Sequence, residues 1–159
     1  MGDAANTLHG TAIAIGASAA LITGKSGAGK SDLALRCLAT VPSPLIPVQA
    51  HLVADDRVLV SAVDGRLRAE VPGSIAGKLE VRGMGIVEVP FLSSADLVLI
   101  VELVAPGAVQ RLPDPPPRRQ VLGHSLPLLQ LCPFEASAPL KLLLALTRMA
   151  QMSAKPLES

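Results

Sequence analysis

A glycine-rich loop near the start of the chain constrains its fold more than any other sequence feature. The loop matches G-x-x-x-x-G-K-[ST] at every fixed position. Its residues are Gly24, Lys25, Ser26, Gly27, Ala28, Gly29, Lys30 and Ser31. Glycines let successive N–H groups turn inwards on one anion, and a helix N-terminus adds partial positive charge. The loop therefore predicts a nucleotide or polyphosphate site, with Lys30 facing the β- and γ-phosphates and Ser31 binding Mg²⁺.

The residues around the loop have the context that this motif requires. Two short strands are expected at residues 11–15 and 19–23, and residues 30–39 place apolar side chains on one face of a helix. The alternative is a flexible loop that only caps a helix, and the strand-loop-helix order disfavours it. The loop does not select a reaction, because ATPases, GTPases and kinases all carry it. A GTPase needs a base-reading N-K-x-D sequence, which this chain lacks.

Length and composition exclude several classes of protein. The chain has 159 residues, which fits one domain over residues 1–159 and is short for an ATPase motor. Its net charge is +1 and it has no Trp or Tyr, so we expect no nucleic-acid partner. Its apolar runs are too short to span a membrane and no signal-peptide pattern opens it, so we expect a cytoplasmic protein. Cys37 and Cys132 are expected to be small buried side chains.

The rest of the chain predicts a mixed α/β pattern. Asp64-Gly65, between residues 57–63 and 66–71, is a strong hairpin signal. The apolar run 96–104 is typical of a strand that is buried on both faces. Other expected elements are strands at residues 51–54, 78–82 and 86–89, a loop at 105–119 that carries five prolines, and a final helix at 135–152.

Two adjacent aspartates, Asp55 and Asp56, follow the apolar residues 51–54. Neighbouring carboxylates repel each other, and a nearby cation relieves that repulsion. One aspartate could lie beside Mg²⁺ while the other accepts a proton from an attacking hydroxyl. A solvated strand end is the alternative, but the preceding phosphate-binding loop favours the catalytic interpretation. The sequence leaves open which aspartate is the base.

A third element occupies residues 79–89, which read L-E-V-R-G-M-G-I-V-E-V. It consists of two short strand segments hinged by paired glycines. Glu80 and Arg82 are expected on the same face, because side chains alternate along a strand. Taken alone, this segment predicts only a structural hairpin.

This chain resembles the HPr kinase/phosphorylase family in three segments that occur in the family's order. They are the loop at residues 24–31, L-V-A-D-D at residues 52–56, and residues 79–89. The family pattern has a phosphate loop, then L-V-A-D-D, then L-E-I-R-G-x-G-I-x-x-V, and a histidine before the first strand, here His9. The resemblance is best over residues 8–104 and implies the short form, the catalytic domain alone. It implies the P-loop kinase fold shared with phosphoenolpyruvate carboxykinase, an α/β fold with a mixed sheet and flanking helices. It also implies a mobile proline-rich loop at about 105–120 and a hexamer.

The resemblance implies an ATP- and Mg²⁺-dependent protein serine kinase acting on HPr, the small phosphocarrier of the phosphotransferase system. The family also removes that phosphate by attack of inorganic phosphate. Carried over to this chain, the loop holds phosphates and Lys30 stabilises the transferred group. The metal ligands would be Ser31, Asp55 and Glu80. The catalytic residues would be His9 near the phosphate, Lys30, Asp56 as the base, and Arg111 on the mobile loop.

One family element is missing from this chain. A cluster resembling P-V-R-P-G-R, tied to dephosphorylation, precedes the last helix in the family, whereas residues 132–137 here read C-P-F-E-A-S. Two phosphate-binding arginines are therefore absent, which leaves the reverse reaction open. It also leaves open a second interpretation, a non-catalytic nucleotide sensor that binds an HPr-like partner. Arg118 and Arg119 are expected to be a solvated pair in the proline-rich loop.

Overall fold

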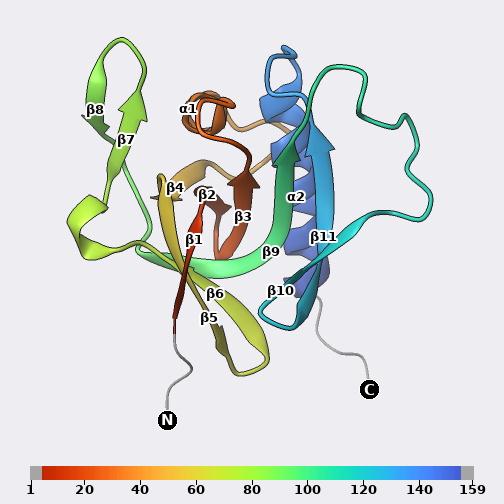
Figure 1. The fold of residues 1–159 in the computed structure, drawn as a ribbon, viewed down its shortest axis with the longest axis horizontal. Coiled ribbons are helices and arrows are strands. Elements are labelled where there is room, and N and C mark those ends of the chain that lie inside the picture. The colour runs from red at the N-terminus through yellow and green to blue at the C-terminus, as the bar shows by residue number, and fades with distance from the viewer. Residues whose placement is uncertain (1–4, 155–159) are drawn as a thin grey trace.

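A curled mixed sheet forms the centre of the structure, a computed structural model that describes residues 5–154 (Figure 1). The main sheet has nine strands, and β7 and β8 form a separate two-stranded ribbon. The elements are β1 (Asn6–His9), β2 (Thr11–Ile15), β3 (Ser18–Thr23), α1 (Lys30–Leu38), β4 (Ala50–Ala54), β5 (Arg57–Val63), β6 (Arg66–Glu70), η1 (Gly73–Ile75), β7 (Lys78–Val81), β8 (Gly85–Glu88), β9 (Ser94–Leu103), β10 (Arg118–Val121), β11 (His124–Leu131) and α2 (Ala138–Ala154).

Strand β9 joins the parts of the main sheet. It pairs in parallel with β3 along its length and with β11 over its last residues, and its first residues pair antiparallel with β6. From β3 the sheet continues through β2 to β4, and from β6 through β5 to β1, in antiparallel pairs. The buried, nearly continuous apolar sequence of β9 fits this central position. The expected mixed sheet is confirmed.

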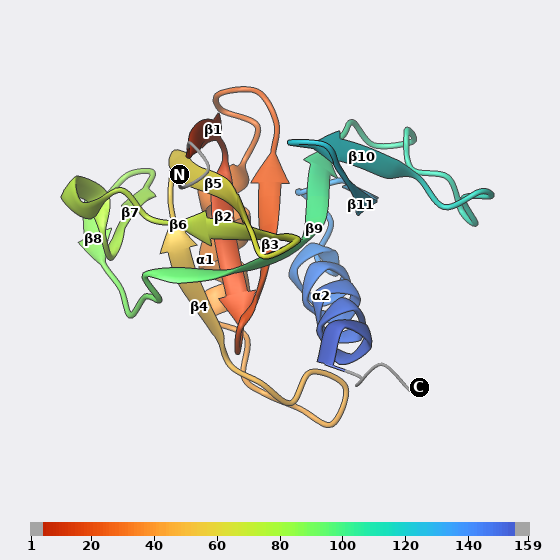
Figure 2. The same ribbon diagram turned by 90° about the horizontal axis from the view of Figure 1, so that it is seen from below.

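The core lies on both faces of the sheet and is built from Ala, Val, Leu and Ile side chains. Alternate residues of β2 face opposite ways: Ile13 and Ile15 belong to the cluster under the helices, and Ala12 and Ala14 belong to the cluster under β5 and β6. Helices α1 and α2 pack against each other on the first face, and α2 lies along β9 (Figure 2). No helix within residues 5–154 has the length and apolar character needed to cross a membrane.

Most of the predicted elements are confirmed to within one or two residues. The predicted hairpin consists of β5 and β6, and its turn residues Asp64 and Gly65 both have positive φ angles, 52° and 77°. That geometry is what a tight I′ turn requires. The first helix ends one residue before the prediction, whereas the final helix begins at Ala138 rather than at Glu135. Cys37 and Cys132 are both buried, as predicted.

The prediction of Arg118 and Arg119 as a solvated loop pair is wrong, because both belong to β10. Arg119 donates hydrogen bonds to the Glu102 carboxylate and, at 3.2 Å, to Thr23 Oγ1. Arg118 Nε donates to Ser125 Oγ at 2.7 Å across the β10–β11 hairpin. The predicted loop at 105–119, or about 105–120, therefore ends at residue 117, and its mobility stays a prediction.

Strands β1, β10 and β11 are absent from the sequence predictions, and the reasons are local for the last two. The β10–β11 turn consists of Leu122 and Gly123, both with positive φ (47° and 80°). A leucine rarely adopts this conformation, so the sequence carries no turn signal there. Pro127 lies within β11, and a proline inside a segment argues against predicting a strand there.

Candidate active site

The glycine-rich loop connects β3 to α1 and is held in shape by its own lysine. Lys30 Nζ donates to the carbonyl oxygens of Gly24 and Lys25, both at 2.8 Å, and this side chain is 8% exposed. Gly27 and Gly29 have φ angles of 81° and 102°, a left-handed region that side chains disfavour. An ammonium group has three N–H donors, so within the described residues one remains for a phosphate oxygen.

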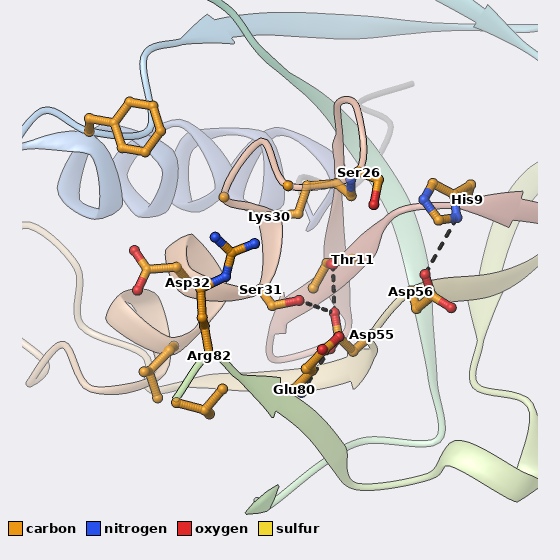
Figure 3. Close-up of a pocket in the computed structure, with 15 residues that line it drawn as sticks. His9, Thr11, Ser26, Lys30, Ser31, Asp32, Asp55, Asp56, Glu80 and Arg82 are labelled. Atoms are coloured by element: carbon orange, nitrogen blue, oxygen red, sulfur yellow. Dashed lines mark hydrogen bonds and ion pairs between the residues drawn. The ribbon is translucent and has the colours of Figure 1, made fainter. Parts of the chain in front are cut away.

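Asp55 connects three elements at the end of β4. Its Oδ1 accepts hydrogen bonds from Thr11 Oγ1 at 2.8 Å and Ser31 Oγ at 2.7 Å, and its Oδ2 accepts one from the Glu80 backbone N–H at 3.0 Å (Figure 3). The residue is only 6% exposed. The carboxylate is therefore fixed beside the hydroxyl of the loop serine, on the first turn of α1.

Asp56 lies in a different environment although it is the next residue. It has a φ of 72°, and its carbonyl accepts a hydrogen bond from the Gly10 N–H at 3.1 Å. Its side chain is 67% exposed and faces His9, with 3.5 Å between His9 Nδ1 and Asp56 Oδ1. The turn between β4 and β5 thus directs the two neighbouring carboxylates to different places.

A cavity of about 410 Å³ brings most of the predicted site residues together (Figure 3). The predicted residues that line it are His9, Ser26, Gly27, Gly29, Lys30, Ser31, Asp55, Asp56 and Glu80. Gly24, Lys25 and Ala28 belong to the loop but do not line the cavity. Arg111 lies exposed between β9 and β10, outside the lining, so the structure does not bring it to this site.

The cavity also contains residues that sequence reasoning did not assign to the site: Thr11, Asp32, Leu35, Val81, Arg82 and Phe134. Arg82 lies in the segment singled out at residues 79–89, so its motif was the available signal. Thr11 carried no signal, since its role is a buried hydrogen bond to Asp55. Phe134 lies in the segment 132–137, which the sequence analysis noted only for its missing arginines, and its place beside Gly29 arises from tertiary packing.

The side chains of Ser31 and Asp55 present oxygen atoms, which can act as metal ligands. Within residues 5–154 no three or more His, Cys, Asp or Glu side chains are grouped so that they could hold a metal ion by themselves. Mg²⁺ is usually bound by one or two carboxylates together with waters and substrate phosphates. A serine hydroxyl next to one fixed carboxylate, at the rim of a phosphate loop, fits that pattern.

Known proteins resemble this chain in sequence and in fold. Residues 3–135 match the family model described as the HPr Serine kinase C-terminal domain. The HPr kinase/phosphorylase of Clostridium novyi is 42% identical over 92 residues, which are 58% of this chain and 27% of that protein. The protein of the same name from Clostridium tetani is 39% identical over 97 residues, 61% of this chain and 29% of that protein. The chain therefore spans less than a third of the length of these relatives.

A solved structure resembles nearly the whole chain in its fold. The Hpr(Ser) kinase/phosphatase from Coxiella burnetii superimposes with a TM-score of 0.72 and 25% sequence identity, covering 93% of this chain and 92% of that chain. Together with the family match, this likeness confirms the resemblance stated from the sequence and the expected α/β fold with a mixed sheet and flanking helices.

Proposed function

Because this chain belongs to the HPr Serine kinase C-terminal domain family, we propose that it is an ATP- and Mg²⁺-dependent protein kinase that phosphorylates a serine of HPr and so regulates the phosphotransferase system. One observation carries the proposal: a phosphate-binding loop and two carboxylates from the end of β4 line the same cavity. Phosphoryl transfer needs these parts, since its catalysis is mainly positioning and charge stabilisation.

The loop side of the cavity would hold ATP. The N-terminus of α1 and the loop N–H groups bind phosphate oxygens, and Lys30 donates to the transferred group. Mg²⁺ would be held by Ser31 and Asp55, with Glu80 nearby, and would supply positive charge against the phosphates. Since Thr11 and the Glu80 N–H already orient Asp55, this carboxylate is fixed for such a role.

Asp55 and Asp56 have different roles in this proposal, because they differ in how far a protein substrate can reach them. Asp55 is buried and its oxygens accept three hydrogen bonds, whereas the Asp56 side chain is mostly exposed. A serine on another protein can reach only the exposed carboxylate. We therefore assign Asp56 as the base that takes the serine proton while the serine oxygen bonds to the γ-phosphorus and ADP leaves. His9 would help to orient Asp56.

The reverse reaction, removal of the phosphate by inorganic phosphate, has less support. Pro133 and Phe134 lie beside Gly29 of the phosphate loop, but residues 132–137 carry neither of the two arginines of the family cluster. That absence favours the second candidate, a nucleotide sensor that binds an HPr-like partner without turnover. The catalytic role of Arg111, the hexamer and the cytoplasmic location remain predictions.

The deciding experiment incubates the purified chain with ATP, Mg²⁺ and HPr from its own organism and looks for phosphoserine by mass spectrometry. We expect phosphoserine that requires both ATP and Mg²⁺. If ATP binds and HPr binds but no phosphoserine forms, the sensor is favoured and the kinase proposal fails. Adding inorganic phosphate to phosphorylated HPr, with pyrophosphate as the readout, tests the reverse reaction separately.

A further inference from the structure

Phe134 is an exposed aromatic ring beside the phosphate-binding loop. It is 76% exposed and lines the cavity, and a Cβ atom added at Gly29 would lie 3.8 Å from its ring atom Cε1. The chain has only two Phe and neither Trp nor Tyr, and among the described residues this ring is the one Phe side chain that lines the cavity. Single exposed apolar side chains are common on protein surfaces. The position of this one, at the rim of an anion site, calls for a specific explanation.

The backbone around Phe134 is tied to the helix that carries the phosphate loop. Arg36 of α1 donates to the carbonyl oxygen of Pro133 and, at 3.5 Å, to that of Glu135, which are the residues on either side. Arg36 Nε also donates to Asp32 Oδ2 at 3.1 Å, in the first turn of the same helix. The backbone that carries the ring is therefore set relative to the N-terminus of α1 before any ligand arrives.

The cavity has two ends, and the proposed reaction places the attacking serine at one of them. His9 and Asp56 lie at one end, and Asp32 and Arg82 lie at the other, with Lys30 and Ser31 between them (Figure 3). In phosphoryl transfer the attacking and leaving oxygens lie roughly in line with the phosphorus. Since the serine approaches on the Asp56 side, the rest of the nucleotide must extend towards the opposite end.

That opposite end has the apolar character that a nucleobase needs. Leu35 and Val81 line the cavity, Leu35 about one helical turn after Asp32 and Val81 next to Arg82 in the chain. Phe134 lies near the same end, because Arg36 bonds both to Asp32 and to the carbonyl oxygens that flank Phe134. An aromatic ring without a hydrogen-bonding group binds a base through its face. We propose that Phe134 is the stacking platform for the base of the bound nucleotide. This inference rests on the proposed use of ATP and adds the residue that would hold the nucleoside.

The first test compares two ligands that differ in the nucleoside. ATP and inorganic tripolyphosphate, each with Mg²⁺, are titrated against the wild-type chain and Phe134→Ala. We expect Phe134→Ala to weaken ATP binding by about tenfold, the scale of losing one aromatic–base stack. Tripolyphosphate binding should change by less than about twofold, because the phosphate cradle is intact. Leu140→Ala is the matched control, since Leu140 is exposed on α2 and outside the cavity lining.

The second test uses the absence of tryptophan from the sequence. Phe134→Trp would give the chain its only tryptophan. We expect ATP affinity close to wild type and a change in indole fluorescence on adding ATP but not on adding tripolyphosphate. Leu140→Trp should report neither ligand.

The outcomes separate this inference from the proposed function. If Phe134→Ala binds ATP as tightly as wild type, or loses ATP and tripolyphosphate equally, Phe134 is not a base platform. In either case a wild-type chain that makes phosphoserine on HPr keeps the kinase proposal. Conversely, a selective loss of ATP binding supports the platform even when wild type makes no phosphoserine, which would refute only the kinase proposal.

Discussion

Ser31 donates a hydrogen bond of 2.7 Å to Oδ1 of Asp55, and this bond joins the phosphate loop to the end of β4. Ser31 belongs to α1, and Asp55 directly follows β4, the next strand in the chain. The same carboxylate oxygen accepts a bond from Thr11 Oγ1. A single buried acid thus sets the position of the loop hydroxyl relative to the first strands of the sheet.

Replacing Asp55 by Asn should destabilise the fold. An amide has one acceptor oxygen where the carboxylate has two, so the Ser31 and Thr11 hydroxyls and the Glu80 N–H cannot all remain paired. We expect the free energy of unfolding to fall by about 1–3 kcal/mol, the cost of an unsatisfied buried group. Urea unfolding followed by circular dichroism measures it. An unchanged midpoint would mean that the hydrogen bond lost in this variant contributes nothing to stability.

Replacing Asp56 by Asn should instead remove activity and leave the fold intact. Its side chain is exposed, and Asn tolerates the positive φ of this position, so we expect a stability change within about 0.5 kcal/mol. Loss of a general base lowers kcat by roughly 10²–10⁴. The measurement is the rate of phosphoserine formation on HPr with ATP and Mg²⁺ at saturation. Loss of Mg²⁺-dependent ATP binding instead would exchange the roles of the two aspartates.

The parts of the site that could be predicted are those whose signal lies within one short segment. The phosphate-binding shape of residues 24–31 can be predicted, because the glycines, the lysine and the start of the helix follow one another in the sequence. The separation of Asp55 from Asp56 could not be predicted. It depends on the turn into β5, where Asp56 takes a φ of 72°, and on a hydroxyl contributed by β2.

Tertiary packing explains the remaining misses. Phe134 reaches Gly29 because Arg36 binds the carbonyl oxygens on both sides of it, a contact across 97 to 99 positions of sequence. No periodicity or spacing encodes such a contact. Likewise, β10 pairs with β11 through a turn at Leu122, a residue that turns of this kind disfavour. Residue preferences therefore predict a loop at the start of this hairpin rather than a strand.

Replacing Lys30 by Ala should abolish phosphoryl transfer. The ammonium group holds two loop carbonyls, and under the proposed function it would supply positive charge to the transferred phosphate. We expect the rate to fall by about 10²–10³, as for other lost electrostatic groups in an active site. Lys78→Ala is the control, because the Lys78 side chain is exposed and, among the described residues, bonds only to the Ser74 carbonyl. A Lys30→Ala variant with near wild-type transfer would exclude this role.

Cys37 should make the stability of the chain depend on pH above 9. Burial raises the pKa of its thiol from 9.0 to about 12, and the nearby Arg36 guanidinium only partly opposes this. Between these values the unfolded thiol has lost its proton while the folded one keeps it, so unfolding is favoured as pH rises. The stabilisation is complete below pH 9 and is lost by about pH 12, at about 1 kcal/mol per pH unit.

Urea unfolding at pH 8, 9 and 10 should therefore show a steeper decline in the free energy of unfolding for wild type than for Cys37→Ala, in which the other titrating groups are unchanged. Parallel declines in the two proteins would show that the buried thiol does not govern this pH dependence.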